Sequence, residues 1–274
     1  MKDDFSSLEK MLYPGRGIIV GLTPSENPFI GYFLTGRSKS SQARKLVYSE
    51  SVYPEKTGIV RTEATDKEQL EKGNPSLLLY PALVSVRDMI IASNGIQTEL
   101  IYSAAIDLIL NDLVTKNSVQ SFSSKAVIEK AFSSEQVRYD SKTNTLIYIT
   151  RSEPDEPNNT PRINACIKDN KPAICILKKD ELNTVYTGYL KSGKGKLITT
   201  YKGGNENPLL PFRGEPIDIK IVSQTVEELV KSIYNSLNDF KVSAAVMMHN
   251  KKTKEMEVAI INKSENGVHK EFKR

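Results

Sequence analysis

Short runs of β-branched and aromatic residues, each bounded by glycine, proline or asparagine, recur along almost the whole chain. Several of these runs alternate in polarity, as strands with one buried face do. Helical patterns are fewer, and they follow pairs of strands instead of alternating with single strands. This organisation favours an α+β fold over a doubly wound α/β fold. The expected strands cover residues 16–22, 28–35, 45–52, 82–93, 145–150, 163–168, 173–178, 184–190, 196–202, 218–223, 243–248 and 256–262.

Three segments have the apolar spacing of amphipathic helices. They cover residues 98–117, 124–132 and 225–240. We expect Thr98 to cap the first of them, and Thr225 with Glu228 to form a capping box at the start of the last. Two sheets faced by helices would use all of these parts.

The size of the chain allows one large domain or two small ones. Its 274 residues are 39% hydrophobic, which is enough to bury a sizeable core. A stretch rich in glycine and proline at 203–216 is the best candidate for a break or a mobile loop. Its flanks continue one β pattern, however, so we expect a single domain over residues 1–274.

Cysteine content and the N-terminal stretch indicate a compartment. The two cysteines, Cys166 and Cys175, each lie inside an apolar run, which is typical of buried structural thiols. The first ten residues, MKDDFSSLEK, lack an apolar signal core, and no stretch reaches 18 apolar residues. We therefore expect a cytoplasmic protein that does not engage a membrane.

Metal and histidine chemistry find little support in the sequence. His249 and His269 are the only histidines, and neither belongs to a metal-binding spacing. The acidic residues do not follow a calcium-binding ladder, and no GxSxG motif is present. We predict no metal site, and an enzyme built on this sequence would work without metal and without histidine.

A basic segment, GRSKSSQARK (36–45), directly follows an expected strand. Arg37 and Arg44 lie there among serines and a glycine, a composition that suits a phosphate monoester. A solvated basic loop would have the same composition. RNA binding would call for interleaved aromatic residues, which this segment lacks. The net charge of +5 suits an anionic metabolite as well as it suits nucleic acid.

The segment SNGIQTELI (93–101) joins an expected strand to the first helix. Gly95 gives the turn conformational freedom, while Asn94 and Thr98 offer polar groups near a helix N-terminus, which attracts anions. A plain helix cap would use the same residues.

An acidic, proline-rich loop precedes the expected strand at 163–168. It reads RSEPDEPNNTPR (151–162) and contains Glu153, Asp155, Glu156 and Arg162. A solvated connection is one interpretation of this composition. A carboxylate held close to an arginine at the mouth of a strand is the functional alternative.

These segments, taken in order, resemble the archaeal-type IMP cyclohydrolases. The resembling stretches are GRGIIVG, GYFLTGRS with the basic run after it, NPSLLLY, SNGIQTELI, the acidic loop with TPRI, and IDIKIVSQTVEEL before SAAVMM. The resemblance implies a four-layer αββα sandwich of two mainly antiparallel sheets flanked by helices, like that of N-terminal-nucleophile hydrolases. Met1-Lys2 offers no Ser, Thr or Cys nucleophile, which fits the cyclohydrolase branch, where none is needed.

The implied reaction closes the purine ring of 5-formamidoimidazole-4-carboxamide ribotide to give IMP and water. It involves no redox change and no group carrier, so no cofactor is expected. The enzyme must select a conformer, move protons and stabilise developing oxyanion charge. Carboxylate, tyrosine and arginine side chains suffice for these tasks.

The resemblance assigns the acidic residue ahead of TPRI, Glu153, the role of general acid/base. We expect Asp155 and Glu156 to raise its pKa by like-charge repulsion, which would suit proton transfer near neutrality. Arg162 would orient the nucleotide or the carboxylate. Which of the three acidic side chains points inward is left open by the sequence.

The remaining assignments also come from the resemblance. Tyr80, in NPSLLLY, would donate to the formyl oxygen, and Arg44 would stabilise the oxyanion. Substrate binding is assigned to Arg37, which would hold the 5′-phosphate, and to Asn94, Gly95 and Thr98 beside it.

Other functions remain open from the sequence. One is a purine-nucleotide-binding regulatory protein that kept the pocket and lost the chemistry. Others are a basic RNA-associated protein and a hydrolase of another substrate on the same fold. The partner that we expect is a small purine ribonucleotide, with no nucleic acid, and a homo-oligomer is compatible with the sequence.

Overall fold

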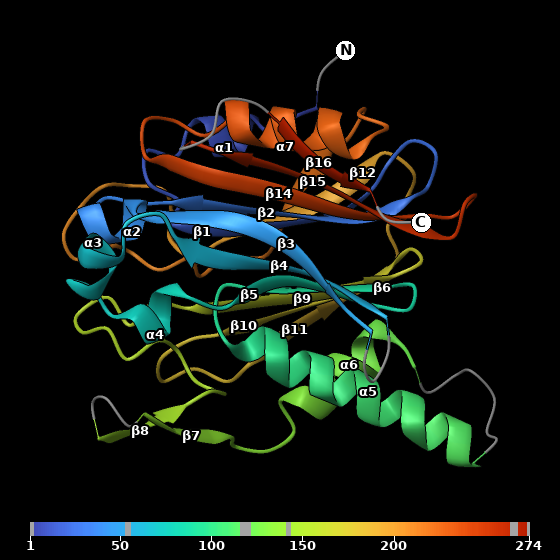
Figure 1. Ribbon diagram of the computed structural model, residues 1–274, viewed down its shortest axis with the longest axis horizontal. Coiled ribbons are helices and arrows are strands. Elements are labelled where there is room, and N and C mark those ends of the chain that lie inside the picture. The colour runs from blue at the N-terminus through green and yellow to red at the C-terminus, as the bar shows by residue number, and fades with distance from the viewer. Residues whose placement is uncertain (1–2, 53–55, 116–121, 141–143, 264–267, 273–274) are drawn as a thin grey trace.

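Two large antiparallel β-sheets pack face to face, with helices on both outer faces, in a computed structural model of the chain (Figure 1). The structure describes residues 3–52, 56–115, 122–140, 144–263 and 268–272. The layers are therefore helix, sheet, sheet and helix. The expected α+β sandwich is confirmed.

Among the described residues, each large sheet has seven strands. The order in the first sheet is β13 (Ile217–Lys220), β12 (Lys194–Thr199), β1 (Arg16–Leu22), β2 (Pro28–Thr35), β14 (Lys241–Asn250), β15 (Glu255–Asn262) and β16 (Val268–Phe272). The order in the second is β11 (Thr184–Thr187), β10 (Lys171–Leu177), β9 (Arg162–Lys168), β6 (Met89–Ser93), β5 (Pro81–Val86), β4 (Thr57–Ala64) and β3 (Arg44–Ser51). A separate hairpin pairs β7 (Val137–Asp140) with β8 (Thr145–Tyr148).

Helices α1 (Ser6–Glu9) and α7 (Val226–Asn235) cover the first sheet, while α5 (Gln97–Thr115) and α6 (Ser124–Ala131) cover the second (Figure 1). Three short helices lie near one end of the sandwich: α2 (Lys39–Gln42), α3 (Lys67–Glu71) and α4 (Pro75–Leu78). The segment 36–45, expected as a loop, therefore contains a helical turn capped by Ser38.

The central core lies between the two sheets. Ile18 and Tyr32 of the first sheet pack there with Leu83, Ile90 and Ile163 of the second, and all five side chains are buried. Strands β1 and β2 are buried along their whole length because a helix layer covers their other face. Burial on both faces explains why these strands read as nearly continuous apolar runs.

Of the two helix caps predicted from the sequence, one is present in the structure and the other is not. Thr225 and Glu228 form the expected capping box at α7. The prediction that Thr98 is the cap of α5 is wrong, because that helix begins at Gln97 and the Thr98 hydroxyl donates to the Gly95 carbonyl, 3.2 Å away.

The expected strand at 82–93 is two strands, β5 and β6, joined by a tight turn at Arg87 and Asp88. Arg87 has a φ of 52°, the left-handed conformation that reverses the chain there. Both cysteines are free and buried, as expected. Among the described residues, no helix is long and apolar enough to span a membrane.

Candidate functional site

A polar pocket of about 260 Å³ opens at one end of the sandwich. Strand β1 begins there, β2 ends there and β3 begins there, while the acidic loop before β9 closes one side. The arginines and acids in its wall are Arg16, Arg37, Arg44, Glu153 and Asp155. This pocket brings together the basic segment 36–45, the acidic loop 151–162 and the stretch 203–216, which the sequence analysis considered separately.

Glu153 lies between two arginines at the base of this pocket. Its Oε2 is 2.8 Å from Arg16 Nη2 and 2.9 Å from Arg162 Nη1, and all three side chains are at most 10% exposed. Arg16 is the first residue of β1 and Arg162 is the first residue of β9. The start of one strand in each sheet therefore supplies one cation to the same carboxylate.

Arg44 forms the opposite wall and has unused hydrogen-bonding capacity. Its Nε donates to the Ser41 carbonyl at 2.9 Å, and the residue is 3% exposed. Its Nη1 is buried and has no hydrogen-bond partner among the residues that the structure describes. A buried guanidinium donor in a pocket wall is suited to bonding an anionic group.

The environment of Glu153 lowers its pKa. Burial alone would raise that pKa, but the charges of Arg16 and Arg162, the hydrogen bond from Arg16 and the charge of Arg44 more than offset the effect. The expectation that Asp155 and Glu156 would raise the Glu153 pKa is therefore wrong. The charges of three arginines outweigh the effect of burial, and Glu153 is ionised at neutral pH.

This lowered pKa predicts how stability depends on pH. Because the folded-state pKa lies below the unfolded value of about 4.3, Glu153 stabilises the fold above that value, and this contribution is lost as the pH falls through the folded pKa. Urea unfolding at about pH 6 and about pH 3 should show a larger loss of free energy in the wild type than in Glu153→Gln. Equal losses in the two proteins would contradict the ion-pair geometry.

Asp155 and Glu156 lie in different environments. Asp155 is half-buried in the pocket wall, where its carboxylate accepts from the Thr160 amide at 2.6 Å and from the Thr160 hydroxyl. Burial, followed by the charge of Glu153, raises the Asp155 pKa. Glu156 instead is exposed and pairs with Lys179 at 2.6 Å. Glu153 and Asp155 therefore face inward, and Glu156 faces away.

A hydroxyl relay connects Asp155 to the far wall of the pocket. The Thr160 hydroxyl lies 2.6 Å from the Tyr201 hydroxyl and also contacts Asp155. If Thr160 donates to the carboxylate, Tyr201 must donate to Thr160. Burial raises the pKa of Tyr201 to about 12, so its phenol keeps its proton.

Tyr80 is buried behind the pocket and does not form part of its wall. Its hydroxyl lies 2.8 Å from that of Tyr32, and its amide donates to Thr62 Oγ1 at 2.8 Å. Both phenols are close enough to Arg16 to affect its pKa electrostatically. Tyr80 is therefore linked to the site in two ways. It shares a hydrogen bond with Tyr32, and it affects Arg16 electrostatically.

The segment containing Asn94, Gly95 and Thr98 supports the arginines instead of lining the pocket. The Asn94 carbonyl accepts from Arg16 Nη1 at 3.1 Å and from Arg162 Nη1 at 3.2 Å. The Asn94 side chain bridges to β9 through the Pro161 carbonyl and the Ile163 amide. The Asn94 carbonyl thus holds both arginines in place, and Asn94, Gly95 and Thr98 are not among the residues that line the pocket.

Gly95 leaves room for the Arg162 guanidinium. A Cβ at this position would lie 2.5 Å from Arg162 Nη1. We expect Gly95→Ala to displace Arg162 and to lower the free energy of unfolding by about 1–3 kcal/mol, as overpacking does. Gly188→Ala is the matched control in urea unfolding, because a Cβ there meets nothing within 4 Å. A Gly95→Ala protein as stable as the control would argue against this packing.

Arg37 lies at the rim, where it holds the stretch 203–216 against the site. Its Nη1 donates to Asn205 Oδ1 at 3.2 Å and to the Glu206 carbonyl at 3.1 Å. Its guanidinium also lies 5.1 Å from the centre of the Tyr13 ring. Leu209, from the same stretch, forms part of the pocket wall. The stretch 203–216 therefore packs on the candidate site.

Arg16, Tyr32 and Tyr201 were not singled out by the sequence analysis. Arg16 stands at the head of an apolar strand in GRGIIVG, and a charged residue that begins a fully buried strand is the signal that would have identified it. The two tyrosines resemble ordinary strand residues in the sequence. Over the described part of the chain, no group of His, Cys, Asp and Glu is placed to hold a metal ion.

Comparison with known proteins adds one match. The protein-family model described as IMP cyclohydrolase-like protein matches residues 13–125 and 107–254, which together span the pocket residues and most of both sheets. No curated protein matches the chain.

Proposed function

Because the chain belongs to the IMP cyclohydrolase-like protein family, we propose that it closes 5-formamidoimidazole-4-carboxamide ribotide to IMP in purine biosynthesis. The observation that carries this proposal is the Arg16–Glu153–Arg162 cluster beside the unpartnered guanidinium nitrogen of Arg44, all at one pocket. The site thus offers a carboxylate and unused cationic donors to the same ligand.

The reaction is a dehydration whose protons balance within the substrate. The carboxamide nitrogen attacks the formyl carbon and loses one proton, and the formamido nitrogen loses another. The formyl oxygen gains both protons and leaves as water. The catalyst must therefore accept protons from nitrogen, return them to oxygen, and stabilise the oxyanion between these steps.

The charge of the pocket suits a nucleotide monophosphate. Arg16, Arg37 and Arg44 line it against the two carboxylates Glu153 and Asp155, and Arg162 lies directly behind. A bound phosphate would add the negative charge that this arrangement leaves uncompensated. We propose that Arg37 contributes to phosphate binding at the rim.

Glu153 is the proposed proton acceptor. In the ligand-free arrangement the arginines lower its pKa, which makes it a weak base. A substrate anion that engages Arg16 or Arg162 would weaken those contacts and let the pKa rise toward its ordinary value. Asp155, with its raised pKa, lies next to it and is suited to returning protons.

Arg44 and Tyr80 are the proposed groups for the oxygen. The buried Nη1 of Arg44 supports a role in stabilising the oxyanion, because it donates to nothing else among the described residues. Tyr80 would donate to the formyl oxygen only after its hydroxyl turns away from Tyr32. The chemistry as written requires no metal and no cofactor.

Formation of IMP from the formamido ribotide by the purified protein tests this function. The second candidate is a nucleotide-binding regulatory protein, which the same cationic pocket would also suit. Absence of conversion would favour it. Calorimetric titration with IMP then separates the two, because a regulator binds the nucleotide without turning over the precursor.

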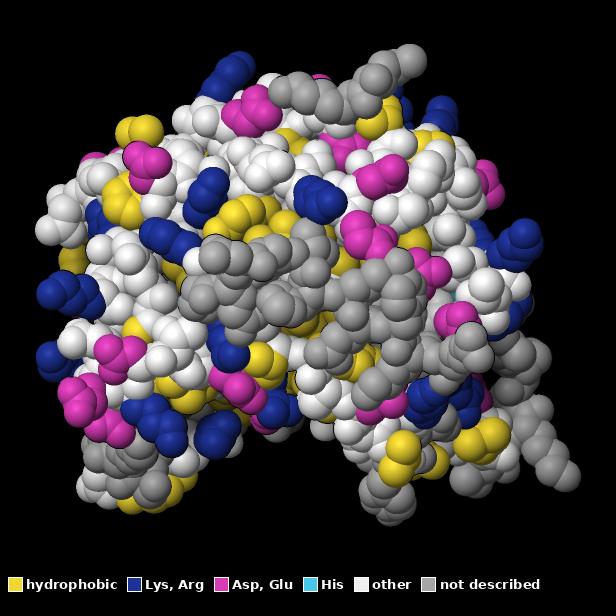
Figure 2. Space-filling model, turned by 45° about the horizontal axis from the view of Figure 1, so that its top comes forward, with side chains coloured by type: hydrophobic (Ala, Val, Ile, Leu, Met, Phe, Trp, Pro, Cys, Tyr) yellow, Lys and Arg dark blue, Asp and Glu magenta, His cyan; other side chains and the backbone are white. Residues whose placement is uncertain are grey.

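An RNA-associated protein is less well supported. Figure 2 shows Lys and Arg interspersed with Asp and Glu on the face that it presents, so the described residues there form no continuous basic surface. Binding to many phosphates would fall steeply with salt, whereas a mononucleotide site predicts a shallow dependence.

A further inference from the structure

Tyr201 stands at the pocket end of a chain of hydrogen-bonded groups that begins at Asp155. It follows strand β12 by two residues, forms part of the pocket wall and is 7% exposed. Its hydroxyl lies 2.6 Å from that of Thr160, which also contacts the Asp155 carboxylate. The Tyr80 hydroxyl instead lies against that of Tyr32, and Tyr80 does not line the pocket. Tyr201 is therefore better placed than Tyr80 to meet a substrate in this pocket.

The backbone and the packing fix this chain of groups before a ligand binds. Thr160 is fully buried: its amide donates to Asp155 Oδ1 at 2.6 Å, and its carbonyl accepts from the Glu153 amide at 2.8 Å. The Tyr201 ring stacks on that of Tyr13, with 5.7 Å between the ring centres. Groups that are held in position in this way need little rearrangement to transfer a proton.

The direction of these hydrogen bonds depends on whether Asp155 carries a proton. When the carboxylate is ionised, Thr160 donates to it and Tyr201 donates to Thr160. When the carboxyl group is protonated, Asp155 can donate to Thr160 and Thr160 to Tyr201, because each hydroxyl has one proton to give. The Tyr201 proton is then free to be donated into the pocket.

Asp155 lies where a proton is retained more easily than on an ordinary carboxylate. Burial and then the charge of Glu153 raise the Asp155 pKa, and the hydrogen bonds from Thr160 and the charge of Arg16 offset this only in part. A substrate phosphate in the same pocket would add negative charge and raise that pKa further. Tyr201 keeps its own proton between transfers, because burial raises its pKa to about 12.

The reaction proposed above requires two protons on the departing oxygen. Glu153 returns the first, which it takes from the carboxamide nitrogen while the new C–N bond forms. Glu153 is then ionised again and accepts the proton of the formamido nitrogen as the C–O bond breaks and the C=N bond forms. The oxygen needs its second proton in that same step, so a donor other than Glu153 must supply it.

We propose that Tyr201 is a further catalytic residue, which gives the departing oxygen its second proton and is resupplied by Asp155 through Thr160. The inference rests on the proposed function. As the Tyr201 O–H bond breaks, a new O–H bond completes the water molecule, and Thr160 and Asp155 each pass one proton along the chain. Asp155 is left ionised and Glu153 protonated, and exchange with solvent restores both before the next turnover.

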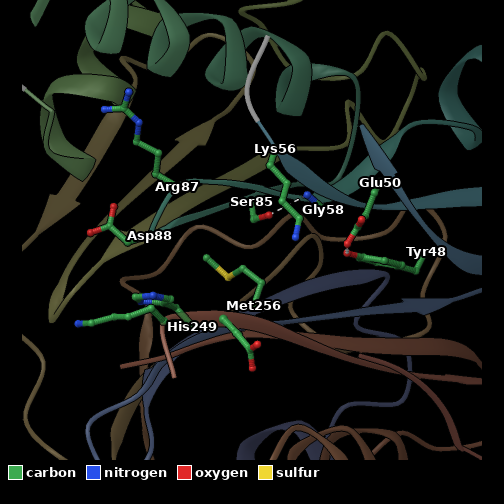
Figure 3. Close-up of a pocket in the computed structure, with 11 residues that line it drawn as sticks. Tyr48, Glu50, Lys56, Gly58, Ser85, Arg87, Asp88, His249 and Met256 are labelled. Carbon is green, nitrogen blue, oxygen red and sulfur yellow. Dashed lines mark hydrogen bonds between the residues drawn. The ribbon is translucent and has the colours of Figure 1, made fainter. Parts of the chain in front are cut away.

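Steady-state kinetics with the formamido ribotide test this role in Tyr201→Phe, which keeps the ring on Tyr13 and removes the hydroxyl. We expect kcat to fall about a hundredfold, the scale of general acid catalysis, with KM nearly unchanged. Tyr48→Phe is the matched control. It also removes a tyrosine hydroxyl that donates to a carboxylate, that of Glu50 at 2.9 Å, but in a separate pocket of about 540 Å³ (Figure 3). That pocket shares no lining residue with the candidate site, so kcat should stay unchanged.

Two variants at Thr160 separate the relay from a structural role. Thr160→Val removes the hydroxyl at nearly constant volume and should lose as much kcat as Tyr201→Phe, whereas Thr160→Ser keeps a hydroxyl and should retain most of the turnover. The double variant Tyr201→Phe/Thr160→Val should be no slower than the slower single variant, because groups that act in series are lost together. Circular dichroism establishes that each variant is folded during the assay.

The outcomes distinguish this inference from the proposed function. No turnover by the folded wild-type protein would overturn both. Turnover by the wild type that Tyr201→Phe retains, or a loss confined to KM, would overturn the role of Tyr201 and leave the proposed function standing. A double variant in which the two losses multiply, or a Thr160→Ser protein as slow as Thr160→Val, would overturn the relay.

Discussion

Replacing Glu153 by glutamine is expected to lower turnover of the formamido ribotide by about a hundredfold or more while nucleotide affinity changes little. Glutamine keeps the shape of the side chain but cannot accept a proton from the carboxamide nitrogen. The measurement is kcat and KM from the absorbance change as IMP forms, together with the calorimetric affinity for IMP.

The loss of Glu153 also affects stability, so folding must be checked in the same experiment. Arg16 and Arg162 would lose their shared counter-charge in a buried site, and breaking such a pair costs about 3–5 kcal/mol. Circular dichroism below the melting transition establishes that the variant is folded during the assay. Glu156→Gln is the matched control, because Glu156 is exposed and should leave kcat unchanged. A folded Glu153→Gln protein that retains most of its turnover would remove Glu153 from the mechanism.

The second large effect is expected for Arg44→Ala. If Arg44 stabilises the oxyanion, its loss should reduce kcat by roughly 10²–10³-fold, the range for removing one such donor. Its side chain forms no ion pair among the described residues, so the free energy of unfolding should fall far less than in Glu153→Gln. Steady-state kinetics and urea unfolding on the same preparation measure both quantities.

Arg61→Ala is the control for Arg44→Ala. Arg61 lies on the adjacent strand β4, is exposed and pairs with Glu63 at the surface, so its loss should leave kcat unchanged. A rise in KM with unchanged kcat in Arg44→Ala would mean that this arginine binds the phosphate and does not act on the oxyanion.

Much of the fold could be predicted from the sequence, because most of its strands have a strong local signal. The expected strands at 16–22 and 28–35 coincide with β1 and β2, and the capping box at Thr225 marks the start of α7. Strand β4 was missed, because its short apolar run is followed by Arg61 and Glu63. Its strand character comes from pairing with β3 and β5, which only the tertiary structure supplies.

The candidate site was less predictable, since its chemistry depends on residues far apart in the chain. Resemblance to a family selected Glu153 and Arg44, and the structure brings both to one pocket. The direction of the Glu153 pKa was wrong because Arg16, which lies 137 positions away, contacts the carboxylate directly. Local sequence showed only the neighbouring acids. Similarly, the segment around Asn94 has the composition of a phosphate-binding turn, but the Asn94 carbonyl accepts hydrogen bonds from two arginines and positions them.

The central claim is that this chain catalyses ring closure at the Glu153 pocket. The most direct measurement is an assay of purified protein with the formamido ribotide, with chelator present, followed by absorbance as IMP forms. The account predicts saturable conversion in proportion to the protein concentration, which Glu153→Gln loses and Glu156→Gln retains. No conversion by the folded wild-type protein, with IMP binding intact, would contradict the claim and favour a regulatory nucleotide-binding protein.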